Sequence, residues 1–173
     1  MKTICSIEAN LGCVRDLEYW EDGELKGRYA SMVATVINDQ KPVTYHTTYL
    51  ENNRKANVSV QRKILSPVSS MSGGAVPLFN HSGSLGIAEG IETALAATQL
   101  YDVPTWAALN ANNLSSFKIP KDVTHLSIFS DNDASFTGQK AAYELAWKAN
   151  RAGVRATVYT PVSYTHLTLP TKA

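Results

Sequence analysis

Three acidic residues follow two apolar segments and have the spacing of a metal site. Glu89 comes directly after the apolar residues 85–88, and Asp131 and Asp133 follow a second such segment, residues 126–130. Carboxylates at the ends of neighbouring parallel strands gather at one edge of a sheet, where three like charges are costly unless a cation neutralises them. Mg²⁺ prefers carboxylate oxygens and keeps positions open for phosphate. We therefore expect Glu89, Asp131 and Asp133 to bind Mg²⁺, for which Mn²⁺ can substitute.

The aspartates also invite other interpretations. Asp133 taken alone could be the N-cap of a following helix. An EF-hand loop starting at Asp131 is excluded, because Phe136 and Ala142 stand where such a loop needs glycine and a bidentate glutamate. A phosphatase of the haloacid dehalogenase type also places Asp-x-Asp after a strand, with the first aspartate as nucleophile. We do not favour that class, because too little chain follows Asp133 to supply its later motifs.

The segments that would position the three acids alternate between strand and helix patterns. Strands are expected at residues 85–88, 104–109, 126–130 and 154–160, and helices near residues 91–100, 114–117 and 139–152. Gly153 stands where the end of a helix favours glycine. Strands that alternate with helices at this spacing form right-handed crossovers and a parallel sheet with helices on both faces. Such sheets bind their ligands at the carboxyl ends of the strands.

The chain before residue 80 has the pattern of a small antiparallel module. Extended segments are expected at residues 32–37, 43–50, 63–65 and 75–79, separated by turn clusters. A helix is expected at residues 11–20, which makes the module α+β. We expect the module to occupy residues 1–80 and a second domain to occupy residues 84–161. Residues 162–173 resemble a translated adapter sequence, and we leave this tail out of the fold.

The composition is that of a soluble globular protein. The chain has 173 residues, of which 44% are apolar, and a formal net charge of +1. This content can form a core, and no stretch approaches the roughly 20 apolar residues of a membrane span. Because the first residues lack a secretory signal, we expect a cytoplasmic protein without a membrane partner. Cys5 and Cys13 are expected to be free, buried thiols.

Basic residues are concentrated between residues 41 and 63, although the net charge of the chain is small. This stretch contains Lys41, Arg54, Lys55, Arg62 and Lys63 against Glu51 alone. It is either a solvated strand surface or a patch that contacts phosphate, and composition does not decide between the two. His46, within an expected strand, fits a strand-face residue better than a catalyst. Trp106 and Trp147 are expected to face the core.

Two sets of motifs resemble a known family. Residues 88–95 (Ala-Glu-Gly-Ile-Glu-Thr-Ala-Leu), with residues 130–133 (Ser-Asp-Asn-Asp) ahead of Gly138, resemble the Toprim domain of phage and plasmid primases. Residues 45–50, Lys55 and residues 73–76 are similar to the module that precedes Toprim in primase-helicase proteins. The resemblance covers roughly residues 25–161. It implies an α/β fold with a Toprim-type, Rossmann-like parallel sheet flanked by helices, preceded by a small α+β antiparallel module.

The resemblance also implies roles for particular residues. Glu89 matches the Toprim glutamate, which is credited with general acid/base work or metal binding, and Asp131 and Asp133 match the metal-binding aspartate pair. Many primases have a further acid four residues after the glutamate, where this chain has Thr93. The number of metal ions, one or two, is therefore left open. In the upstream module, the candidates for phosphate contact are Arg62, Lys63 and Lys55.

The resemblance implies the catalytic domain of a DNA primase. Such an enzyme transfers nucleotidyl groups from nucleoside triphosphates to make RNA primers on single-stranded DNA, here in phage or plasmid replication. Whole proteins of this group often carry a zinc-binding domain and a helicase, so we expect a fragment that works with a replicative helicase. Two alternatives stay open: a Toprim nuclease that hydrolyses phosphodiesters, and a binding module whose site is inert. A topoisomerase fits less well, because its nucleophilic tyrosine lies in a further domain.

Overall fold

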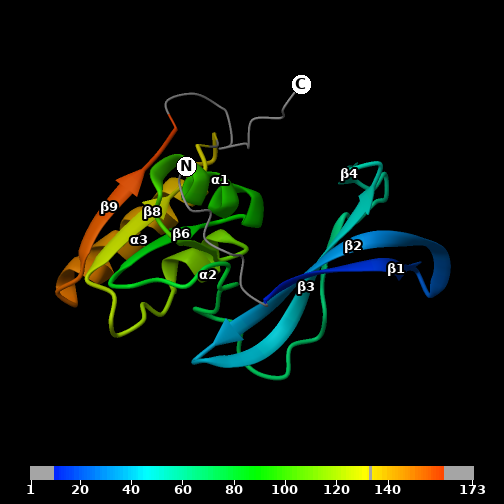
Figure 1. The fold of residues 1–173 in the computed structure, drawn as a ribbon, viewed down its shortest axis with the longest axis horizontal. Helices are drawn as coiled ribbons and strands as arrows, with labels where there is room; N and C mark the ends of the chain where they lie inside the picture. The colour runs from blue at the N-terminus through cyan, green and yellow to red at the C-terminus, as the bar shows by residue number, and fades with distance from the viewer. Residues whose placement is uncertain (1–9, 133, 162–173) are drawn as a thin grey trace.

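The chain contains two sheets of different kinds (Figure 1). The computed structural model describes residues 10–132 and 134–161, so Cys5, Asp133 and the predicted tail lie outside the described residues. An antiparallel sheet comes first along the chain, and a parallel sheet with helices follows. This order confirms the predicted fold class. No helix within the described ranges is long and apolar enough to cross a membrane.

The antiparallel sheet is a meander with short turns. Its strands are β1 (Leu11–Glu21), β2 (Glu24–Asn38), β3 (Lys41–Glu51), β4 (Arg54–Lys55) and β5 (Arg62–Ile64). The first four are neighbours in chain order, and β5 also pairs with β3. The turns at residues 22–23, 39–40 and 52–53 all place both residues at positive φ. Two left-handed residues match the right-handed twist of paired strands, so these turns help to set the register.

The helix predicted for residues 11–20 is wrong, because these residues form β1. The turn at Asp22 and Gly23 folds β1 back onto β2, and the pairing runs from Leu11 with Ala34 to Glu21 with Glu24. Little of β1 is buried, so its hydrophobic pattern is weak and pairing with β2 decides its conformation. Cys13 on this strand is a free thiol, as predicted, but it is exposed rather than buried.

The parallel sheet has the strand order β7-β6-β8-β9. Its elements are β6 (Ser84–Ala88), α1 (Ile91–Tyr101), β7 (Thr105–Ala107), α2 (Ala111–Ser115), β8 (His125–Phe129), α3 (Thr137–Arg151) and β9 (Arg155–Tyr159). Each pair of neighbouring strands is parallel. The strands and helices predicted after residue 84 are therefore confirmed, with shifted ends.

Neighbouring residues of β6 pack against different helices. Ile87 lies in a core cluster with Leu145 of α3. Ala88 lies in a second cluster with Phe129 of β8 and Ile91 of α1. Because successive side chains of a strand point to opposite faces, α1 and α3 cover opposite faces of the parallel sheet.

The second of these clusters joins the two sheets. Val36 of β2 and Val43 of β3 belong to it together with Ile91 of α1. The backbone of residues 75–79 runs between the sheets, with isolated bridges from Ala75 to Ile37 and from Val76 to Ala107. The predicted extended segment at residues 75–79 therefore links the two sheets through these bridges.

The two tryptophans that were expected to face the core differ in position. Trp106 packs against the first cluster, as predicted. Trp147 is 59% exposed on α3, so the prediction for this residue is wrong. It lies two positions after the buried Leu145, which places it on nearly the opposite side of the helix. The guanidinium of Arg151 covers it, 4.8 Å from the ring centre.

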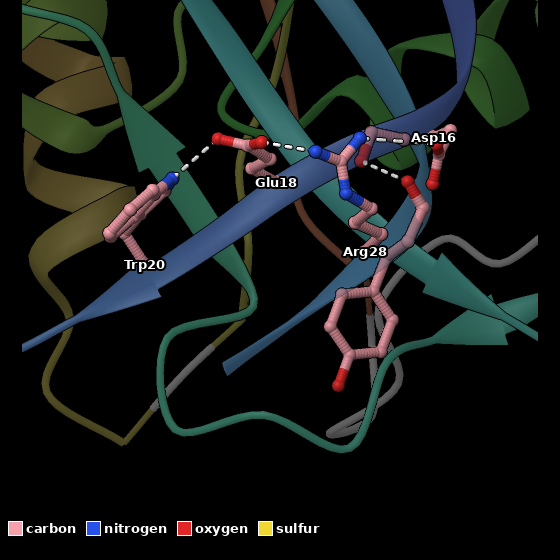
Figure 2. A network of polar contacts seen from close by, with 6 residues as sticks. Asp16, Glu18, Trp20 and Arg28 are labelled. Atoms are coloured by element: carbon pink, nitrogen blue, oxygen red, sulfur yellow. Dashed lines mark hydrogen bonds and ion pairs between the residues drawn. The ribbon is translucent and has the colours of Figure 1, made fainter. Parts of the chain in front are cut away.

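An exposed polar network lies on the β1–β2 ribbon (Figure 2). Arg28 donates to Asp16 at 3.2 Å and also to Glu18. Trp20 donates its indole N–H to the same Glu18 at 2.8 Å. Since all of these side chains are well exposed, the ion pairs contribute little to stability, but Arg28 offsets two of the acids near the start of the chain.

Candidate metal centre at the carboxyl edge of the parallel sheet

Glu89 and Asp131 leave neighbouring strands at the same edge of the parallel sheet. Ala88, the last residue of β6, pairs with Phe129, the last residue of β8. Glu89 follows β6 directly, and Asp131 lies two residues beyond the end of β8. The structure therefore brings these two predicted ligands to one edge. The third predicted ligand, Asp133, is outside the described residues.

Gly138, in the first turn of α3, is the point at which these two segments meet. A Cβ atom added to Gly138 would lie 3.2 Å from the carbonyl oxygen of Asp131, 3.4 Å from Oε2 of Glu89 and 3.5 Å from the amide nitrogen of Asp131. The Glu89 carboxylate and the Asp131 backbone thus approach one position, which stays open because residue 138 has no side chain. Carboxylates are also favoured there by the positive end of the helix dipole.

The loop that carries Asp131 is anchored to the end of β9. Asn132 donates its side-chain amide to the carbonyl of Pro161 at 2.7 Å and accepts from Gln139 at 2.9 Å. Ser130 donates its backbone N–H to Tyr159 at 3.0 Å. These bonds turn Asn132 toward its neighbours and fix the loop at both ends. Such support limits how far the Asp131 backbone can move.

Glu92, in the first turn of α1, ties the antiparallel sheet to this edge. Its Oε1 lies 2.9 Å from Nζ of Lys55 and 2.7 Å from Nη2 of Arg62. Burial raises the pKa of Glu92, but hydrogen bonds from Lys55, the backbone and Arg62 outweigh this and lower it to about 2. Two of the three basic residues predicted to contact phosphate therefore pair with Glu92, which stands three positions after Glu89 in the sequence.

Comparison with known proteins gives the family of the second half of the chain. Residues 84–168 match the family model described as the Toprim domain. The chain contains a Toprim domain. Residues 3–78 match a second model, described as a domain of unknown function (DUF7146). No curated protein matches the chain.

Among solved structures, the chain is similar to the crystal structure of a DNA primase domain from Pseudomonas aeruginosa. The TM-score is 0.55 at 14% identity, over 88% of this chain and 50% of the other. At this identity the similarity concerns the fold, which extends across both the antiparallel sheet and the Toprim domain. The chain spans half the length of that primase structure.

Lys63 and His46 stand near the basic residues that face the Toprim domain. Lys63 lies 4.0 Å above the ring of Tyr19 and also donates to the backbone of Trp20. His46 is buried on β3, and its Nδ1 has no hydrogen-bond partner among the described residues. Burial, and then the positive charge of Arg62, lower the pKa of His46, so its ring is neutral at neutral pH.

Gly90 and Gly138, the two glycines near Glu89 in the Toprim domain, differ in the space available for a Cβ atom. Gly90 has φ −102°, and a Cβ there would make only ordinary contacts, 3.5 Å from Thr93. Thr93, which stands where many primases have a further acid, is buried. The tighter requirement for glycine is at Gly138, for which sequence reasoning gave no role. A glycine inside a helix does not mark a turn in the sequence. The only sequence feature that could have singled out Gly138 was its position after the acidic segment.

Among the described residues, no group of three His, Cys, Asp or Glu side chains is close enough to hold a metal ion. The carboxylate of Glu89 and the backbone of Asp131 approach one open position, both residues are partly buried, and the sequence places Asp133 two residues after Asp131. Hard oxygen donors of this kind fit a divalent cation that also contacts phosphate.

Proposed function

We propose that the chain is the Toprim-containing catalytic part of a DNA primase that makes RNA primers on single-stranded DNA. The observation that carries the proposal is the approach of the Glu89 carboxylate and the Asp131 backbone at Gly138, on the carboxyl edge of the Toprim sheet. The primase-like fold across most of the chain supports it. We further propose that the whole protein acts with a replicative helicase in phage or plasmid replication.

Each residue of the proposed site has a distinct role. Asp131 and Asp133 would hold Mg²⁺, and Glu89 would complete the ligand set or accept the proton of the attacking hydroxyl. When bound, the metal ion neutralises the triphosphate and lowers the pKa of the 3′-hydroxyl. Lys55 and Arg62, held by Glu92 beside this edge, contact the phosphates of the template. Lys63 is proposed as a weaker contact of the same kind.

Primer synthesis from nucleoside triphosphates on a single-stranded template tests this function. We expect activity that needs Mg²⁺ or Mn²⁺ and falls at least about 100-fold in Asp131→Asn, Asp133→Asn and Glu89→Gln. The matched control is Glu144→Gln, which removes a half-exposed carboxylate of α3 whose neighbour is Lys140. This control should retain the activity of the unchanged protein.

Two outcomes would contradict the proposal. Metal-dependent nicking of the template without primer synthesis would assign the site to a nuclease. Template binding that is indifferent to metal, with neither reaction, would mean an inert binding module. A shared loss of activity in Glu144→Gln would show that the substitutions act through folding.

A further inference from the structure

A pocket of about 610 Å³ is lined by neither Glu89 nor Asp131. It opens between the β2–β3 turn and residues 117–122, and its lining includes Asn38, His81, Trp106 and Lys121. His81 precedes β6, whereas Glu89 follows it. A strand of five residues spans about 16 Å. The pocket is therefore separate from the candidate metal centre.

Two buried polar atoms of residues that line this pocket have no partner in the described part of the chain. Oδ1 of Asn38 is one, and the side-chain nitrogen of Asn38 donates to the carbonyls of Ser70 at 2.7 Å and Ser72 at 3.2 Å. These two bonds fix the amide, so its oxygen is left as a free acceptor. Asn38 is only 9% exposed. A buried acceptor without a partner costs about 1–3 kcal/mol, which a ligand donor would offset.

His81 supplies the second unpartnered atom. Its side chain is 9% exposed, and its Nδ1 lies 3.6 Å from Oδ2 of Asp122, beyond hydrogen-bond distance. The imidazole nitrogen can donate or accept, depending on its tautomer. A ligand that meets both atoms therefore needs at least one N–H or O–H donor.

Aromatic rings form one wall of the pocket. Trp106 contacts His81 at a centroid distance of 5.3 Å and Phe117 at 6.2 Å, both edge to face. The indole N–H of Trp106 donates to the carbonyl of Phe79 at 2.8 Å, which fixes the ring. Such a wall favours a flat, aromatic ligand over a flexible or purely ionic one.

The two lysines at the mouth of the pocket differ in their ion pairs. Lys118 lies 2.6 Å from Asp39 and is neutralised by it. Lys121 is exposed and makes no ion pair with any described residue. One lysine is therefore available to an anionic group at the mouth.

The walls are tied together by backbone contacts. Ala75 bridges Ile37, and Lys118 donates its N–H to the carbonyl of Gly73 at 3.2 Å. Gly73 has φ +80°, and a Cβ there would lie 2.5 Å from the carbonyl oxygen of Ser116. The pocket is thus built into the packing of two segments that only a glycine allows to approach.

We propose that this pocket binds a nucleoside phosphate. The base lies against Trp106, and a ring or exocyclic N–H donates to Oδ1 of Asn38. The phosphate lies at the mouth, where Lys121 contacts it. An inorganic anion alone fails to match the pocket, because it would face an unpaired acceptor and the carboxylate of Asp122.

The proposal can be tested by NMR of ¹⁵N-labelled protein without divalent ions, which leaves the candidate metal centre unloaded. Adenosine, guanosine, cytidine and uridine monophosphates are titrated, with ribose 5-phosphate as the probe that lacks a base. We expect at least one nucleotide to shift the indole signal of Trp106, identified from Trp106→Phe, while the Trp147 signal stays in place. Ribose 5-phosphate should not shift the Trp106 signal.

Variants separate the pocket from general charge effects. Lys121→Glu should weaken nucleotide binding about tenfold, whereas Lys140→Glu on the exposed face of α3 should leave it unchanged. Asn38→Ala should abolish binding, and thermal unfolding reports whether this variant is folded. If it is not, the Lys121 series decides. No shift of Trp106 at millimolar nucleotide, equal binding of ribose 5-phosphate, or an unchanged affinity in Lys121→Glu would overturn the proposal.

Discussion

At the scale of single residues, Glu92 connects strands of the first sheet to the helix that follows Glu89. Burial raises the pKa of Glu92, but hydrogen bonds from Lys55, the backbone and Arg62 outweigh it and lower the pKa to about 2, below the usual value of 4.5. A depressed carboxyl pKa adds stability above the unfolded value, and this stability is lost as pH falls from about 4.5 toward 2. Because the Glu92 side chain is half-exposed, solvent screening limits the effect to about 1 kcal/mol or less.

We predict that Glu92→Gln lowers the free energy of unfolding at pH 7 by about 0.5–1 kcal/mol. The difference from the unchanged protein should shrink below about pH 4.5, because protonation then removes from the unchanged protein the same charge that the substitution removes. Urea unfolding between pH 7 and pH 3 measures it. Glu144→Gln serves as the comparison, since its carboxylate is 3.9 Å from a single lysine. A Glu92→Gln difference that is constant with pH would contradict the assignment.

At Gly138, helix propensity favours alanine, whereas the close contacts at the candidate metal centre favour glycine. Alanine is favoured over glycine in a helix by about 1 kcal/mol. Its Cβ would nevertheless press on the Glu89 carboxylate and the Asp131 backbone. We predict that Gly138→Ala changes the melting temperature little but weakens Mn²⁺ binding several-fold in calorimetry. Gly12→Ala, where a Cβ meets nothing within 4 Å, should leave Mn²⁺ binding unchanged. Equal Mn²⁺ affinity in both variants would contradict the geometry.

At the scale of elements, the parallel part could be predicted from the sequence and the first strand could not. The apolar residues of β6 and β8 and the long helix α3 have strong periodic patterns, so their types and order were predicted. Residues 11–21 lack such a pattern, and pairing with β2 decides their conformation. The acids could be assigned to one edge from the strand order. Their approach at Gly138 and the ion pairs of Glu92 could not, because they depend on contacts between distant segments.

At Gly73, the cost of a steric contact can be measured separately from the cost of backbone strain, by comparison with Gly23. Both Gly73 and Gly23 have positive φ, near +80°. A Cβ at Gly23 meets nothing within 4 Å, whereas one at Gly73 would strike the carbonyl of Ser116. We predict that Gly23→Ala costs about 1 kcal/mol and Gly73→Ala clearly more, in chemical unfolding. Similar losses in the two variants would mean that the contact between residues 73 and 116 is not as close as described.

At the scale of the whole molecule, the two sheets share a core although they differ in architecture. Val36 and Val43 of the antiparallel sheet pack in the same cluster as Ile91 and Phe129 of the Toprim domain. The domain boundary that the sequence predicts at residues 80–84 stays a prediction. Because the shared cluster would be exposed by separating the sheets, we expect neither sheet to unfold alone.

Fluorine NMR of protein labelled with fluorotryptophan tests this coupling. Trp20 reports on the antiparallel ribbon and Trp147 on α3 of the Toprim domain. We predict that both folded signals disappear at the same urea concentration. Val36→Ala, which cuts the shared cluster, should destabilise the protein by about 2 kcal/mol and move both midpoints equally. If the midpoint of the Trp20 signal alone moved, the antiparallel sheet would unfold independently. Lys55 and Arg62 would then separate from the carboxyl edge of the parallel sheet without loss of the Toprim fold.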